Sequence, residues 1–206
     1  MQEHLDLACA QLNNTHVQLS NTQETTRKLE GKVKALERRL EGKGYKDQED
    51  GTVTRFIWKI DKFSDILRQA KAGGKNKIES STFYTESYGY KLKVTMSPNG
   101  SWPTGWNTHL SVYIVVMKGE YDAILPWPFK KKVTFTLIDQ QEDSVKRENV
   151  VTHIIPENHK LTYFLRPKEE ENASFGEKCF ISHEELQTGR YLVEDVLFLQ
   201  VEIGPP

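Results

Sequence analysis

Hydrophobic residues recur every seven positions in the first part of the chain. One heptad position reads Leu5, Leu12, Leu19, Thr26, Val33 and Leu40, and the position three places later reads Ala8, Thr15, Thr22, Leu29 and Leu36. Apolar residues at these two positions over several heptads are typical of a coiled coil. The pattern predicts a self-associating helix over residues 1–41 whose C-terminal heptads are the most apolar. A single amphipathic helix packed on a domain is the alternative.

The hydrophobic period changes from seven to two further along the chain. Gly42 and Gly44 end the predicted helix, because glycine favours a helix C-terminus, and a polar stretch follows. Apolar and polar residues then alternate over 54–60, 110–117, 133–137 and 197–203. Short alternating segments separated by polar turns predict β-strands in an antiparallel sandwich. We therefore expect a stalk at 1–41, a linker at 42–50 and a β-domain at 51–206.

One helix is predicted inside the β-domain. Four apolar residues fall at helical spacing before the helix-breaking pair Gly73-Gly74: Phe63, Ile66, Leu67 and Ala70.

Composition and charge exclude several classes of protein. Hydrophobic residues make up 37% and charged residues 28% of the 206 residues, which is typical of a globular protein. No apolar stretch is long enough to span a bilayer, no signal-peptide pattern opens the chain, and Cys9 and Cys179 lie in different segments. We therefore expect a cytoplasmic protein without membrane insertion. The net charge of −1 gives no electrostatic case for nucleic acid as a partner.

The sequence contains no recognisable catalytic or metal-binding constellation. A cysteine protease needs a nucleophile paired with a base, and Cys179 stands in an alternating segment where packing is the simpler interpretation. His183-Glu184-Glu185 lacks the second histidine of a zinc-protease helix, and no Cys/His spacing fits a zinc site. We expect no enzymatic activity, no metal and no cofactor.

A series of short motifs follows a fixed order through the β-domain. It includes Arg55-Phe56-Ile57-Trp58-Lys59-Ile60, Tyr88-Gly89-Tyr90-Lys91-Leu92, Val116-Met117-Lys118-Gly119-Glu120-Tyr121-Asp122, Trp127-Pro128-Phe129, Leu137-Ile138-Asp139-Gln140 and Phe164-Leu165-Arg166-Pro167. Over about residues 51–203, this series resembles the C-terminal domain of the TNF receptor-associated factors (TRAFs). The resemblance implies an eight-stranded antiparallel β-sandwich of the TRAF or meprin-and-TRAF-homology (MATH) type, behind an N-terminal α-helical coiled coil.

The resemblance also implies an assembly and a class of partners. Family members are cytoplasmic adaptors that form mushroom-shaped trimers on a coiled-coil stalk. The stalk residues expected to hold the trimer are Leu5, Leu12, Leu19, Leu29, Val33, Leu36 and Leu40. The implied partners are the cytoplasmic tails of TNF-receptor or Toll/interleukin-1-type receptors and their adaptors, which such proteins couple to ubiquitin-ligase modules that we do not find in this sequence.

In the family, a receptor peptide lies extended across one sheet of the sandwich. Tyr113 matches an aromatic residue of the groove floor, and Phe175 with Gly176 matches the pair that contacts the peptide backbone. Thr95 and Ser97 stand where many members carry an arginine and a tyrosine. Three further positions, Leu161, Thr162 and Tyr163, replace three serines that bind a ligand glutamine.

Two features leave alternatives open. Lys93 has the strand parity of Thr95 and Ser97, so it either replaces the missing arginine as a cation for an acidic ligand residue or is a solvated lysine. Trp102 and Trp106, in the loop at 98–107, either contact a partner or cover an end of the sandwich.

Two other functions compete with that of a receptor-tail adaptor. The first is a substrate-recruiting MATH module of a ubiquitin ligase or deubiquitinase outside receptor signalling. The second is a purely structural oligomer, which a covered face around Tyr113 and Phe175 would favour.

Overall fold

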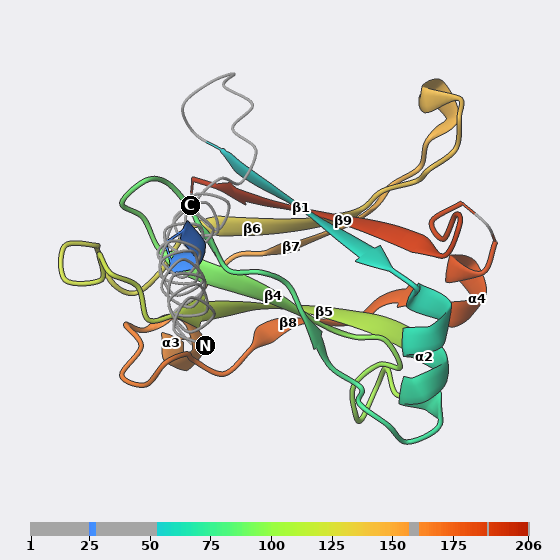
Figure 1. Ribbon diagram of the computed structural model, residues 1–206, viewed down its shortest axis with the longest axis horizontal. Helices are drawn as coiled ribbons and strands as arrows, with labels where there is room; N and C mark the ends of the chain where they lie inside the picture. Colours follow the sequence, from blue (N-terminus) through green and yellow to red (C-terminus); the bar gives the residue numbers. More distant parts are fainter. Residues whose placement is uncertain (1–24, 28–52, 157–160, 189, 206) are drawn as a thin grey trace, which may run out of the picture. The chain divides into compact units, whose positions relative to one another are not determined.

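The computed structural model describes residues 25–27, 53–156, 161–188 and 190–205 (Figure 1). The chain divides into two compact units, Met1–Glu41 and Gly42–Pro206. In the first unit the described residues, 25–27, are helical and exposed, and they include Thr26 of the heptad pattern. The other heptad residues, the seven expected trimer contacts and the predicted linker at 42–50 lie outside the described residues. The rest of this section concerns the second unit.

Two antiparallel sheets face each other across the hydrophobic core (Figure 1). The first sheet contains, in spatial order, β1 (Thr54–Asp61), β9 (Val196–Gly204), β6 (Lys132–Leu137) and β7 (Val150–Ile154). The second contains β2 (Ile78–Glu79), β4 (Lys91–Ser97), β5 (His109–Met117) and β8 (Phe175–Ser182), with β3 (Phe83–Tyr84) also paired to β4. The predicted antiparallel sandwich is confirmed.

The described residues contain nine strands where the sequence predicts eight. The difference arises at the edge of the second sheet, where β2 and β3 both pair with β4 and are separated by residues 80–82. Ser80 lies at this interruption, where its backbone N–H donates to the carbonyl of Val94 and its hydroxyl accepts from the N–H of Val94. A side-chain hydroxyl thus takes the place of a backbone carbonyl, so one edge strand becomes two short ones.

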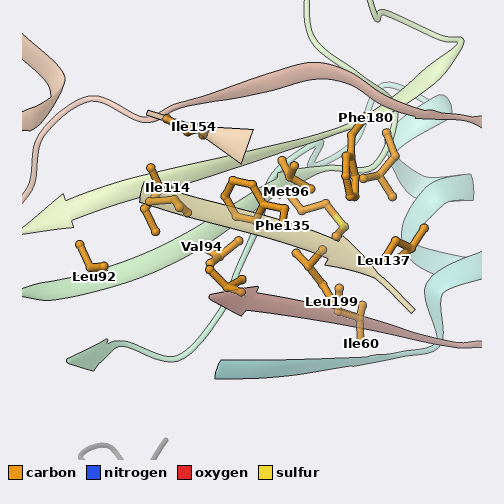
Figure 2. Packing of buried hydrophobic residues seen from close by; sticks show 14 of the residues in the cluster. Ile60, Leu92, Val94, Met96, Ile114, Phe135, Leu137, Ile154, Phe180 and Leu199 are labelled. Atoms are coloured by element: carbon orange, nitrogen blue, oxygen red, sulfur yellow. The ribbon is translucent and has the colours of Figure 1, made fainter. Parts of the chain in front are cut away.

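Alternation along the strands builds the core between the sheets. On the inward side, each of these residues is at most 2% exposed: Leu92, Val94, Met96, Leu110, Val112, Ile114, Val116, Val133, Phe135, Leu137, Leu197, Leu199, Val201 and Ile203. Figure 2 shows part of this packing, with Phe135 between Ile114 and Met96 in the view. Burial of apolar area at about 25 cal/mol per Å² makes this layer the main stabilising element.

The predicted helix is present as α2 (Phe63–Lys71), with Phe63, Leu67 and Ala70 buried. Asp195, far along the chain, fixes where it begins. Its carboxylate accepts from the N–H of Ser64 at 2.7 Å and its carbonyl accepts from the N–H of Phe63 at 3.1 Å. Capping of this kind satisfies N–H groups that have no partner within the helix.

Three short helical segments complete the domain: η1 (Ser144–Lys146), α3 (Leu161–Phe164) and α4 (His183–Leu186). Among the described residues, no helix is long and apolar enough to cross a membrane. The described part of the chain also holds no group of three or more acidic, histidine or cysteine side chains placed to bind a metal.

Candidate functional site: the outer face of β4, β5 and β8

Three of the predicted site residues form one row across the second sheet. In the strand register Thr95 lies opposite Tyr113, and Tyr113 lies opposite Gly176. Directly opposed residues of antiparallel strands project to the same side, so this row lies on the face that points away from the core. Lys93 and Ser97 share the strand parity of Thr95 and therefore the same face. The structure thus brings these five positions together on one face.

The row is only partly accessible. Thr95 is 1% exposed and its hydroxyl has no hydrogen-bond partner within the described structure, whereas Tyr113, Gly176 and Ser97 are half-buried. Tyr113 donates its hydroxyl hydrogen to the hydroxyl of Ser101 at 2.6 Å. The surface that a ligand reaches first therefore centres on Tyr113 and Gly176, and Thr95 lies beneath it.

Lys93 is held by two carboxylates of the same chain. Its ammonium lies 2.9 Å from Glu79 Oε2 and 2.6 Å from Glu171 Oε2, and the residue is 7% exposed. Burial lowers the pKa of Lys93, but hydrogen bonds to Glu171 and Glu79 outweigh that effect and raise the pKa overall. Lys93 is thus neither the solvated lysine nor the free cation that strand parity allowed, because its charge is already neutralised inside the domain.

The same ion pairs act on Glu79. Hydrogen bonds first from Lys77 and then from Lys93 lower the pKa of Glu79 to about 2. Glu79 belongs to β2 and Glu171 bridges Met117 at the end of β5, so the lysine joins three segments of the sheet. With Lys77, the four charged groups form a structural cluster within the domain.

Phe175 lies on the opposite side of the sheet from Tyr113. Its register partner is Ile114, a core residue. Its ring packs against Tyr163 with centroids 5.0 Å apart and edge-to-face against Phe164 at 5.5 Å. Phe175 is half-buried at the sandwich end that α3 covers, so the structure gives it a packing role in addition to any contact with a ligand.

The segment that replaces the family's serines lies beside Phe175. Tyr163 is half-buried against that ring, and Thr162 is exposed. The side chain of Leu161 lies outside the described residues. Because Gly176 directly follows Phe175, β8 connects this aromatic end with the row of Tyr113.

Comparison with known proteins identifies the family. The model of the family described as "TRAF/meprin, MATH domain" matches residues 75–200. The chain belongs to this family.

Individual MATH-domain proteins agree with the match. Human TNF receptor-associated factor 1 is 40% identical over 153 residues, which are 73% of this chain and 35% of that protein. TNF receptor-associated factor 1 of Mus musculus is 35% identical over 96% of this chain and 48% of that protein. A solved structure described as Notothenia coriiceps TRAF5 superposes with a TM-score of 0.71 at 29% identity, and covers 100% of this chain and 94% of its own. The resemblance to TRAF proteins is confirmed, and the chain spans less than half the length of these two curated relatives.

The close packing of two strands explains why position 176 of this MATH domain is a glycine. A Cβ atom there would lie 2.0 Å from the carbonyl oxygen of Val112 and 2.6 Å from the Cα of Tyr113. Only glycine therefore allows β8 to approach β5 so closely. β8 also ends the strand order of its sheet, so no strand among the described residues is hydrogen-bonded to its other side.

β8 departs from regular pairing immediately after this glycine. The register moves from Val112–Glu177 to Leu110–Ile181, so Lys178, Cys179 and Phe180 bulge opposite a single residue of β5. The bulge turns Cys179 to the surface, where it is exposed. The packing role expected for this cysteine from strand alternation is therefore wrong.

Sequence reasoning missed three residues of the MATH-domain face: Ser101, Glu79 and Glu171. Each reaches the face through contacts between distant segments, which strand alternation does not encode. The one available signal was Lys93 itself, because a lysine on a half-buried strand needs a carboxylate partner.

Proposed function

We propose that this chain is the trimeric, receptor-binding part of a cytoplasmic signalling adaptor, and that the outer face of β8 and β5 binds extended peptide segments. The observation that carries the proposal is the row in which half-buried Tyr113 of β5 lies opposite half-buried Gly176 of the terminal strand β8. A terminal strand offers backbone groups to an added strand, and a neighbouring aromatic ring offers a surface for one side chain.

The charges on the face favour a neutral peptide. Lys93 is neutralised by Glu79 and Glu171, and Thr95 and Ser97 carry no charge. A carboxylate of a ligand would therefore gain no ion pair at these three positions and would lose hydration. An apolar or aromatic ligand residue that packs on Tyr113 loses no comparable hydration. We therefore expect selectivity for apolar residues there and no preference for an acidic residue.

The names of the relatives support the choice of partner. They are called TNF receptor-associated factors, and this chain matches their MATH domain. By this likeness we propose tails of TNF-receptor or Toll/interleukin-1-type receptors and their adaptors as the source of the peptide. The domain would couple such tails to ubiquitin-ligase modules that we do not find in this sequence, and the chain itself would have no enzymatic activity.

Trimerisation through the predicted coiled coil would make weak binding useful. A shallow face with few anchoring contacts typically binds with a dissociation constant of about 1 µM to 1 mM. Linked sites that engage clustered tails can strengthen binding by about a hundredfold without new contacts.

Peptide selection tests the proposal. The full 206-residue chain is used to select from a phage-displayed library of random 12-residue peptides, and the affinity of a selected peptide is measured by fluorescence polarisation. Tyr113→Ala should weaken binding by about tenfold or more because it removes the ring at the centre of the row. Tyr113→Phe keeps the ring and should bind within about threefold of the wild type.

The matched control is Val145→Ala, since Val145 lies in η1, is 92% exposed and is remote in sequence from the face. It should leave binding unchanged. Failure of the wild type to enrich any peptide, or equal binding by Tyr113→Ala, would contradict the proposal.

A further inference from the structure

The loop at 98–107 carries two exposed tryptophans. Trp102 is 79% exposed, more than any other aromatic side chain in the described part of the chain, and Trp106 is 45% exposed. Trp102 therefore does not bury its ring over an end of the sandwich, and Trp106 does so only in part. A large apolar ring held in water is unfavourable unless a partner covers it, and tryptophan is enriched where proteins bind one another.

The loop is fixed at its base by asparagine side chains. Asn76 accepts from the N–H of Asn99 at 2.8 Å and donates to the carbonyl of Gly100 at 2.8 Å. Asn99 in turn donates to the side-chain oxygen of Asn107 at 2.5 Å, and the N–H of Asn107 donates to the carbonyl of Asn99 at 3.0 Å. The two ends of the loop are thus tied to each other and to the segment before β2.

A buried histidine fixes the loop from the other side. Nε2 of His183 lies 2.9 Å from the carbonyl of Pro98, and the backbone N–H of His183 donates to the carbonyl of Thr108 at 2.8 Å. Burial lowers the pKa of His183, so the neutral ring with its hydrogen on Nε2 is the form that donates to Pro98. A loop anchored in this way presents Trp102 with little loss of conformational freedom on binding.

Two glycines shape the loop and seat it on β8. Gly100 has φ +74°, and a Cβ atom there would lie 1.8 Å from the carbonyl oxygen of Gly105. A Cβ atom on Gly105 would in turn lie 2.3 Å from the carbonyl oxygen of Lys178 in the bulge of β8. Glycine is required at both positions for the loop to fold back and rest on the bulge.

The loop continues the face described above. Ser101, which accepts the hydrogen bond from Tyr113, directly precedes Trp102. Gly105 of the loop rests against the carbonyl of Lys178 in β8, and Lys178 lies two residues after Gly176 on that strand. A strand advances about 3.3 Å per residue, so a peptide lying over Gly176 and Tyr113 reaches the loop within about three to five further residues.

We propose that Trp102 is a second anchoring point of this face and binds an apolar side chain of the same extended peptide, three to five residues from the one that covers Tyr113. This inference rests on the proposed function. No residue of the loop is charged, so the side chain bound there is aliphatic, aromatic or proline and carries no charge. Trp106 lies in the same loop but is only 45% exposed, so it contributes less to peptide binding than Trp102 does.

Selection on matched variants tests the inference. The full chain and its Trp102→Ala variant are each used to select from the random 12-residue phage library. Peptides from the wild type should share two apolar positions separated by three to five residues, and selection on Trp102→Ala should lose one of them. A wild-type-selected peptide should bind Trp102→Ala about tenfold more weakly. Val145→Ala, which shortens another exposed apolar side chain, should match the wild type.

The outcomes separate this inference from the proposed function. Equal peptide binding by Trp102→Ala and wild type, with binding still lost in Tyr113→Ala, would overturn the inference and leave the proposed function intact. Absence of any peptide bound to the wild type would overturn both. A lower molecular mass of Trp102→Ala in solution, with peptide affinity unchanged, would show that the ring contacts a second copy of the chain and would also overturn the inference. Thermal unfolding of Trp102→Ala should match the wild type, because the ring is 79% exposed.

Discussion

At the scale of single residues, the cluster around Lys93 shows how a surface strand position becomes part of the interior. A lysine alone on a strand would extend into water, but two carboxylates within 3 Å retain this one at 7% exposure. Replacing a buried ion pair by an apolar side chain of similar size is often neutral, whereas removing one partner is costly. Two substitutions at Lys93 can therefore separate the charge from the packing.

We predict that Lys93→Ala lowers the free energy of unfolding by about 1–2 kcal/mol, and that Lys93→Met lowers it by less than about 1 kcal/mol. The loss stays moderate because Glu79 and Glu171 remain about one-third exposed or more and can hydrate. The measurement is urea unfolding followed by tryptophan fluorescence. Lys118→Met, at an exposed lysine after β5, is the control and should have no effect. If the two Lys93 variants lost the same free energy of unfolding, the volume of the side chain at position 93 would not contribute to stability.

The pH dependence of the same cluster has a definite sign. The folded-state pKa of Glu79, about 2, lies below its ordinary value of 4.5. The stabilisation from this carboxylate is therefore complete above about pH 4.5 and is lost as the pH falls through about 2. In Lys93→Met this loss should be smaller, because Lys77 alone remains to hold the carboxylate.

At the scale of elements, strand and helix positions were largely predictable. Period-two alternation located β1, β5, β6 and β9, and helical spacing located α2, because each buries one face on the core. The interrupted edge made of β2 and β3 was not predictable, since it depends on a hydrogen bond between Ser80 and Val94.

The candidate site was predictable to a smaller degree. Strand parity placed Lys93, Thr95 and Ser97 on one face, because side chains alternate strictly along regular strands, whereas Tyr113 came from the family resemblance. Strand parity does not tell how deeply a side chain is buried, however, so the burial of Thr95 and the ion pairs of Lys93 could not be predicted from it. It also failed beyond Gly176, where the bulge of β8 breaks the alternation and exposes Cys179.

The contact between β8 and β5 gives a prediction for Gly176. Gly176→Ala should lower the free energy of unfolding by about 2–4 kcal/mol, because its methyl group would overlap backbone atoms of Val112 and Tyr113, which have little room to move. Thermal unfolding measures the effect. Gly204→Ala is the matched control: it lies at the end of β9, has no atom within 4 Å of the added Cβ, and should change stability by less than about 0.5 kcal/mol. Equal melting temperatures for the two variants would mean that β8 does not approach β5 closely in solution.

At the scale of the whole molecule, the heptad pattern predicts the assembly. The most apolar part of the pattern is Leu29, Val33, Leu36 and Leu40, at the C-terminal end of the stalk. In a parallel coiled coil, each core position of one helix packs against the same position of the other copies. Charges at two adjacent core positions should therefore separate the helices.

We predict that Val33→Asp combined with Leu36→Asp converts the proposed trimer to monomer at micromolar concentration, while the β-domain keeps its melting temperature. Sedimentation velocity gives the mass. Arg38→Asp, at a heptad position outside the apolar seam, is the control for added negative charge and should remain trimeric. A double variant that keeps the trimer mass would show that the stalk does not hold the assembly.

The terminal position of β8 has one more consequence. A strand edge that can receive a peptide can also pair with the same edge of another molecule, and such pairing is a common route to aggregation. Glu177 and exposed Lys178 follow Gly176 directly, and the bulge twists the strand from there onward. Charges and bulges at a sheet edge oppose pairing between identical strands, while a short peptide needs only the few residues before them. The same few residues would thus oppose edge-to-edge association when many copies of the domain are brought close together.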